Sequence, residues 1–154
     1  MSPCSVSAQW LARAAFEPAV ATALWAQGQP APLMVGRRWD LVRLDFRLAT
    51  AVITQLKTRG DHIGPYVMGG VERAMWWLLP LGSARRLVGV PDVIPYRRGA
   101  ELFAPPPGGY AGDRMWVLPD GEDGRRHVLT SADDLREALR AAPRRLADRA
   151  TPCR

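Results

Sequence analysis

The sequence contains very little of the residue types from which metal sites and disulfide frameworks are built. Its 154 residues include two cysteines and two histidines. Cys4 and Cys153 stand near opposite ends of the chain, so they lack the short spacing of a zinc-binding pair, and a disulfide would have to join the two ends. With only His62 and His127 to add to them, we expect neither a zinc site nor a structural disulfide.

Long apolar runs are also missing. No stretch approaches the roughly 18 uninterrupted apolar residues of a membrane-spanning helix. The opening segment Met-Ser-Pro-Cys-Ser lacks the basic start of a secretory signal. We therefore expect a cytoplasmic protein with no membrane partner.

Lysine occurs once, so arginine carries almost all the positive charge. Twenty arginines and one lysine outnumber 15 acidic residues, and the net charge is +6. The abundance of arginine and alanine is typical of a high-GC genome of the actinobacterial type. Residues 125–154 hold eight arginines and four acids, which places +4 of the charge at this end. Such a segment either holds a nucleic-acid phosphate backbone or keeps the protein in solution, and the sequence leaves both readings open.

Length and hydrophobic content indicate one domain. A chain of 154 residues with 47% hydrophobic residues can bury one sizeable core but not two. Near-helical apolar spacing predicts an N-terminal helical pair within residues 5–25, divided at Pro18. At the other end, Thr130 or Ser131 should cap a helix that buries Leu135 and its neighbours. We place the domain at residues 1–142, followed by a basic tail at 143–154.

Between these helices the pattern predicts a sheet. Residues 48–59 carry the apolar stripe of an amphipathic helix that ends at Gly60. Residues 75–79 are apolar on both faces, as in a central strand that is covered on both sides. The expected fold is α+β, or close to α/β, with a mixed sheet of about five strands. The predicted strands are 38–45, 62–68, 75–79, 101–104 and 114–118.

Three motifs in this region resemble a known family. They are Leu41-Val-Arg-Leu-Asp45, Met68-Gly-Gly-Val-Glu72, and a segment from Pro95 that ends in Ala104-Pro-Pro-Pro107. In order and spacing they resemble the N-terminal bifunctional DNA primase/polymerase domain, which belongs to the archaeo-eukaryotic primase-like proteins. The resemblance is closest over residues 36–118. It implies a primase/polymerase-like core and a role in DNA replication or a plasmid- or phage-related process.

The same motifs depart from the family where its chemistry resides. Nucleotidyl transfer by two metal ions needs carboxylates that converge on Mg²⁺ or Mn²⁺. Arg43 stands where the first aspartate of the Asp-x-Asp motif belongs, no histidine follows the Gly-Gly turn, and Pro95 is near the third acidic position. Mg²⁺ or Mn²⁺ is expected only if some activity survives. The remaining candidates for a catalytic site are Asp45, Glu72 and Glu101.

Strand alternation weakens this candidate metal site further. Asp40 and Asp45 are five residues apart, so a regular strand places them on opposite faces. Arg43 falls on the same face as Asp45, and a guanidinium there favours pairing with the carboxylate over leaving it to a cation. We expect a degenerate site without efficient catalysis.

Pairs of arginines in predicted loops are the candidate phosphate contacts. Each pair could bind a phosphate oxygen pair through its guanidinium groups if the loops converge at one end of the sheet. Scattered, solvated loops in an arginine-rich protein are the alternative. The candidates are Arg37, Arg38, Arg85, Arg86, Arg97 and Arg98.

Three further features each have a structural as well as a functional interpretation. Trp76 and Trp77 could stack on bases, but within an apolar strand they are expected in the core. The segment 105–109 could border a nucleotide pocket, and we favour a structural corner. His62 beside Asp61 could carry a proton, although a surface turn is the simpler expectation.

These observations lead to three hypotheses. The first is a degenerate primase/polymerase-like protein that binds DNA or a nucleotide, together with a separately encoded replication protein. The second is a protein–protein interaction module on the same fold. The third is a weak metal-dependent nucleotidyltransferase.

Overall fold

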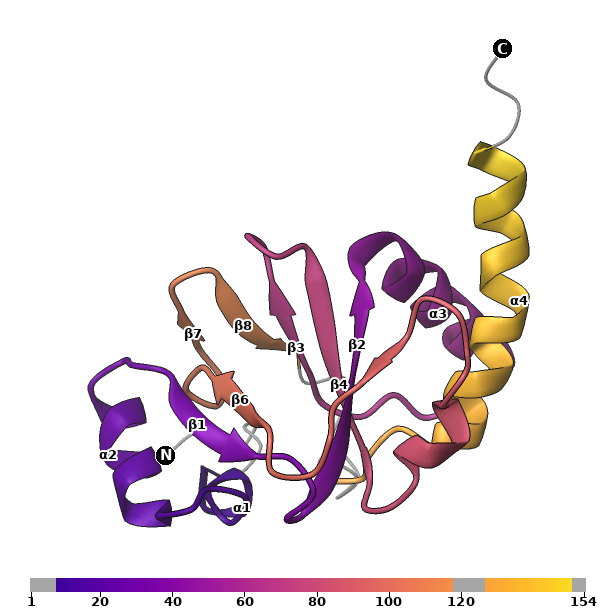
Figure 1. The fold of residues 1–154 in the computed structure, drawn as a ribbon. Coiled ribbons are helices and arrows are strands. Elements are labelled where there is room, and N and C mark those ends of the chain that lie inside the picture. The colour runs from indigo at the N-terminus through magenta and orange to yellow at the C-terminus, as the bar shows by residue number, and fades with distance from the viewer. Residues whose placement is uncertain (1–7, 118–126, 151–154) are drawn as a thin grey trace.

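A six-stranded antiparallel sheet forms the middle layer of the protein (Figure 1). The computed structural model describes residues 8–117 and 127–150, and the side chains of the last helix as far as Ala142. The strand order is β5-β2-β4-β3-β8-β7, and a separate two-stranded sheet pairs β1 with β6. The strands are β1 (Ala31–Met34), β2 (Trp39–Asp45), β3 (Tyr66–Gly69), β4 (Ala74–Pro80), β5 (Ile94–Pro95), β6 (Glu101–Ala104), β7 (Tyr110–Ala111) and β8 (Arg114–Val117).

Strand β4 is the centre of this sheet. It pairs with β2 along its whole length, from Trp39 opposite Pro80 to Asp45 opposite Ala74, and with β3 on its other edge. Because β4 is covered on both faces, every residue from 74 to 79 is buried. Trp76 is 1% exposed and Trp77 is fully buried, which confirms the expectation that both belong to the core.

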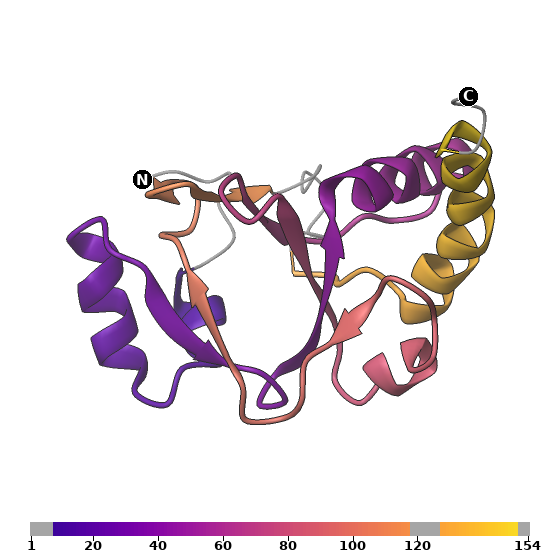
Figure 2. The same cartoon turned by 45° about the horizontal axis from the view of Figure 1, so that its top comes forward.

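Two long helices cover one face of the sheet. Helix α3 (Phe46–Arg59) packs against α4 (Ala132–Ala150), and both bury apolar side chains against the face that carries Trp77 (Figure 2). Helix α3 begins where the Asp45 side chain accepts a hydrogen bond from the Leu48 amide. It ends at Gly60, whose φ of 74° is the left-handed conformation that glycine favours at a helix C-terminus. The predicted helix over residues 48–59 is therefore confirmed.

The opposite face is covered by the β1–β6 pair and two short helices (Figure 2). Helices α1 (Ala8–Ala12) and α2 (Pro18–Ala26) are separated at Pro18, which is the first residue of α2, as expected. The two-stranded sheet and these helices bury Trp39, Trp76 and Trp116 on the second face. The fold class α+β with one domain is confirmed, and each strand pairing in the described chain is antiparallel.

The proline-rich segment after β6 is a structural corner. The carbonyl oxygen of Pro105 accepts a hydrogen bond from Trp116 Nε1 at 2.7 Å. The carbonyl oxygen of Ala104 accepts one from Trp25 Nε1 at 3.0 Å. Two indoles from different layers therefore fix the backbone here, and both bonds are buried.

One predicted strand is shorter than expected. Residues 62–65 are not part of a strand, and β3 begins only at Tyr66. The amide of Gly64 donates to Thr130 Oγ1, and a Cβ at Gly64 would lie 2.6 Å from the Val128 carbonyl oxygen. The segment before α4 thus lies against Gly64, and residues 62–65 contact this segment instead of pairing with a strand of the sheet. The Thr130 hydroxyl oxygen accepts the bond from the Gly64 amide, and it is Ser131 that caps α4: its Oγ accepts a hydrogen bond from the Asp134 amide.

Other differences concern short elements and the chain ends. Strands β5 and β7, of two residues each, were not predicted because so short a run has no periodicity. The backbone of α4 continues across Pro143 to Ala150, so the predicted boundary at residue 142 does not coincide with a helix end. A short 3-10 helix, η1 (Ala84–Leu87), follows β4. Cys4 and Cys153 lie outside the described residues.

Replacing Trp77 tests the central position of β4. Trp77→Ala should lower the free energy of unfolding by about 3–5 kcal/mol, because a fully buried indole leaves a cavity. Urea denaturation followed by circular dichroism measures this. Val71→Ala, at a residue that is 81% exposed, is the control and should change stability by less than about 0.5 kcal/mol. A Trp77→Ala loss below about 1 kcal/mol would contradict the assignment.

Burial of Tyr66 should make the free energy of unfolding decrease at alkaline pH. Its ring stacks on Trp77, with centroids 4.4 Å apart, and burial raises the pKa of its phenol above the ordinary value of 10.0. Above pH 10 the unfolded chain therefore loses this proton before the folded chain does, so stability should fall as pH rises through the folded pKa. Tyr66→Phe should show a smaller fall between pH 9 and 12 in urea titrations. Identical profiles for both proteins would refute this role of Tyr66.

Candidate functional site

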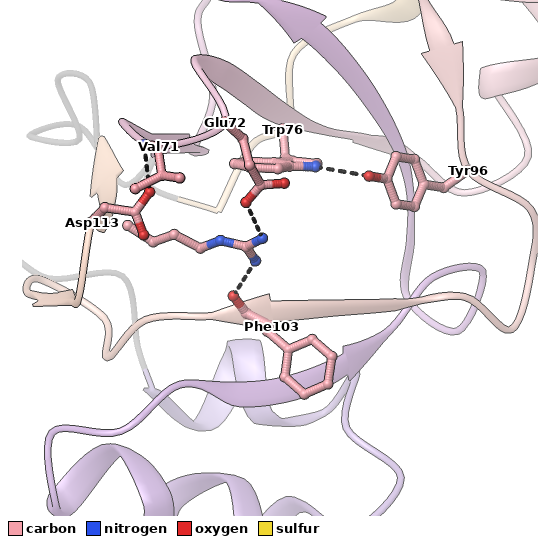
Figure 3. Close-up of polar contacts among 7 residues, drawn as sticks. Val71, Glu72, Trp76, Tyr96, Phe103 and Asp113 are labelled. Atoms are coloured by element: carbon pink, nitrogen blue, oxygen red, sulfur yellow. Dashed lines mark hydrogen bonds and ion pairs between the residues drawn. The ribbon is translucent and has the colours of Figure 1, made fainter.

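Arg114 connects the two sheets on the face opposite the long helices, through contacts with Glu72 and Phe103, both of which Figure 3 labels. It begins β8, and its Nη2 atom lies 2.8 Å from Glu72 Oε1 in the turn between β3 and β4. Its Nη1 atom donates to the carbonyl oxygen of Phe103 in β6 at 2.8 Å. The planar guanidinium thus joins the six-stranded sheet to the β1–β6 pair, a fork geometry that lysine cannot reproduce.

The indole of Trp76 lies at the centre of the same cluster. The Arg114 guanidinium carbon is 4.4 Å from its ring centroid, and that of Arg43 is 5.7 Å away. Trp76 Nε1 donates to the Tyr96 hydroxyl at 3.0 Å. A Cβ at Gly69 would lie 2.7 Å from the ring, so only glycine leaves room for it. Two guanidinium groups therefore lie within cation–π distance of the buried Trp76 indole.

A second turn is tied to this cluster by Asp113. Its Oδ2 atom accepts a hydrogen bond from the Val71 amide at 2.7 Å, and its carbonyl oxygen accepts one from Gly70. These bonds hold the β3–β4 turn against the turn that precedes β8. Sequence reasoning missed Asp113, Arg114 and Tyr96 as members of a polar cluster. Strand alternation in 114–117 would have placed Arg114 on the same face as Trp116, which was the available signal.

The structure does not bring the three candidate catalytic carboxylates together. Asp45 Oδ1 accepts a hydrogen bond from the Leu48 amide at 2.8 Å and caps α3. Glu72 is paired with Arg114, and Glu101 lines a pocket beside α2. Over residues 8–117 and 127–142, no three acidic, histidine or cysteine side chains are grouped as metal ligands would be. The expected pairing of Arg43 with Asp45 is also wrong, because Arg43 lies over Trp76 and Asp45 caps the helix.

Asp40 lies on the other face of β2, as alternation predicted. Its Oδ2 atom accepts a hydrogen bond from the Ala84 amide at 2.9 Å, which fixes the start of η1. The carboxylates of Asp40 and Asp45 therefore both satisfy backbone amides at the ends of helical segments. The capped segments, α3 and η1, both bury side chains in the cluster on the sheet face that carries Trp77.

Two of the three arginine pairs are brought together by the backbone. Arg37 and Arg38 lie in the turn between β1 and β2, and Arg97 and Arg98 lie between β5 and β6. These two connections lie side by side in the ribbon (Figure 2). The Val35 amide donates to the Ala100 carbonyl oxygen, and the Gly99 amide donates to the Val35 carbonyl oxygen, both at 2.8 Å. We call Arg37, Arg38, Arg97 and Arg98 the four-arginine surface.

Glycine allows this close approach. Gly36 has a φ of 87°, and a Cβ there would lie 2.4 Å from Arg98 Cγ. All four arginines are exposed, and none forms an ion pair with an acidic residue in the described part of the chain. Their guanidinium groups are thus available to an anionic partner.

The third pair lies elsewhere, on η1. Arg85 and Arg86 line an open pocket of about 510 Å³ together with Ser83 and Ser131. Arg86 Nη1 is 2.7 Å from Asp133 Oδ2 at the start of α4. Because α4 supplies a counter-charge, this pocket is less suited to a phosphate than the four-arginine surface is.

Comparison with known proteins does not assign a family. No protein-family model, curated protein or solved structure matches this chain. No helix formed by the described residues is both long enough and apolar enough to cross a bilayer. Function must therefore be argued from the residues and their geometry.

Removing Arg114 tests its role between the sheets. Arg114→Ala should lower stability by about 2 kcal/mol, because it leaves the Phe103 carbonyl and Glu72 without their charged partner. Arg114→Lys should recover only part of this, since one ammonium cannot serve both groups and the indole. Arg85→Ala, at an exposed arginine, is the matched control and should stay within about 0.5 kcal/mol. Equal stability of Arg114→Ala and Arg85→Ala in urea denaturation would contradict the bridge.

Proposed function

We propose that this protein is a degenerate primase/polymerase-like protein that binds the phosphate backbone of nucleic acid without efficient nucleotide transfer. The four-arginine surface is the binding site in this proposal. Nucleotides, which carry the same phosphate groups, are the smaller ligands of the same site. The protein would act in the cytoplasm, in DNA replication or a plasmid- or phage-related process.

The observation that carries this proposal is the convergence of the two arginine loops. Arg37 and Arg97 belong to segments 60 residues apart in sequence, and backbone hydrogen bonds hold these segments together. Two loops that the backbone holds together bring four exposed arginines to one surface, where several guanidinium groups can contact neighbouring phosphates. The net charge of +6 also favours approach to a polyanion.

The arrangement of carboxylates supports binding over synthesis. Two-metal transfer needs acidic oxygens that converge on the ions, whereas Asp45 caps α3, Glu72 pairs with Arg114 and Glu101 lines a pocket beside α2. One oxygen of the Asp45 carboxylate is already bonded to the Leu48 amide at the start of α3. A weak metal-dependent transferase is therefore disfavoured, and it remains testable.

Removing two arginines should weaken binding in a salt-dependent way. Arg97→Ala with Arg98→Ala should reduce affinity for a fluorescent single-stranded oligonucleotide, as measured by anisotropy between 50 and 300 mM salt. Each lost phosphate contact lowers the slope of log affinity against log salt by about 0.7 for single strands, so the double variant should lose roughly 1.4. Weakening should be similar for different base sequences, because phosphate contacts carry no base information.

The matched control removes two charges from the opposite layer. Arg47→Ala with Lys57→Ala on the exposed side of α3 should leave the slope nearly unchanged. If both double variants weaken binding equally, general positive charge and not the four-arginine surface is responsible. Primer extension by the unaltered protein with Mn²⁺ and nucleoside triphosphates would overturn the non-catalytic part of the proposal.

A further inference from the structure

A small pocket lies on the outer side of the β1–β6 pair, against α2. Its volume is about 190 Å³, and its walls include Ala21, Pro32 and Met34. Ligand sites for small molecules and cofactors usually span about 300–1,000 Å³. The pocket is therefore of a size for one inserted side chain.

Exposed apolar side chains surround this pocket. Phe16 is 71% exposed and Val20 is 48% exposed, and both line it. Phe103, at 49%, is on β6 two residues after Glu101, and strand alternation places both on the same outer face. These are three of the ten large apolar side chains that the described residues expose, and exposed apolar side chains that cluster mark interaction surfaces.

The charge at the pocket is opposite to that of the protein as a whole. Glu17 and Glu101 line it, both are exposed, and neither forms an ion pair with a described basic residue. Two carboxylates beside an apolar hole repel a phosphate backbone and attract cations. The pocket therefore favours a cationic occupant over a nucleic acid.

We propose that this acid-rimmed pocket docks a basic segment of a partner protein, which inserts one aliphatic side chain and places flanking arginines or lysines on Glu17 and Glu101. The inserted side chain supplies the buried anchor, and the charges supply orientation. The pocket does not include the four-arginine surface, so this inference stands independently of the proposed nucleic-acid function.

A short labelled peptide tests the chemistry directly. Fluorescein-labelled Arg-Arg-Leu-Arg-Arg should bind the full chain in an anisotropy titration, and Arg-Arg-Ser-Arg-Arg and Glu-Glu-Leu-Glu-Glu should bind more weakly. Glu17→Gln with Glu101→Gln should weaken binding about tenfold, through loss of two surface ion pairs. Val20→Asp should also weaken it, by placing a charge on the apolar wall. These residues are exposed, so the variants should fold, which circular dichroism verifies.

The matched control removes two carboxylates elsewhere. Asp133→Asn with Glu137→Gln on α4 should leave peptide binding unchanged. The proposal is overturned if the leucine and serine peptides bind equally well, or if the two double variants behave alike. Sedimentation of the full chain separates a second possibility: self-association that Val20→Asp abolishes would show that the occupant is another copy of this chain.

Discussion

The burial of strand β4 on both faces is the constraint on which the rest of the structure depends. A strand with apolar side chains on each face needs a separate layer on each side. Helices α3 and α4 provide one layer, and the β1–β6 pair with α1 and α2 provides the other. Because consecutive tryptophans point into different layers, Trp76 and Trp77 each anchor one half of the core.

Trp76 also extends this constraint from the core to the polar cluster. Its ring makes cation–π contacts with the guanidinium groups of Arg43 and Arg114. Its Nε1 atom donates a hydrogen bond to the hydroxyl of Tyr96, which follows β5. Tyr96 is followed directly by the loop that carries Arg97 and Arg98. The position of the arginine loop is thus tied to the buried strand through one indole and one hydroxyl group.

Much of the fold could be predicted from periodicity, but little of the site could. The apolar run 75–79 and the helical stripe 48–59 are local signals, and both were confirmed. Residues 62–65 were misassigned because their contacts with Val128 and Thr130 come from a segment more than 60 residues away. Convergence of the arginine loops depends likewise on bonds between Val35 and residues 99–100, which no local pattern reveals. The alternation rule did separate Asp40 from Asp45 correctly.

Arg43 illustrates why we propose binding and not synthesis for this primase/polymerase-like sequence. An arginine here gains an aromatic partner in Trp76 and a place in the core boundary. Replacing it with aspartate would not by itself create a metal site. Asp45 would remain bonded to the Leu48 amide, and Glu72 would remain paired with Arg114. Both carboxylates take part in structural contacts, so a metal site here would require changes across the whole cluster and not one substitution.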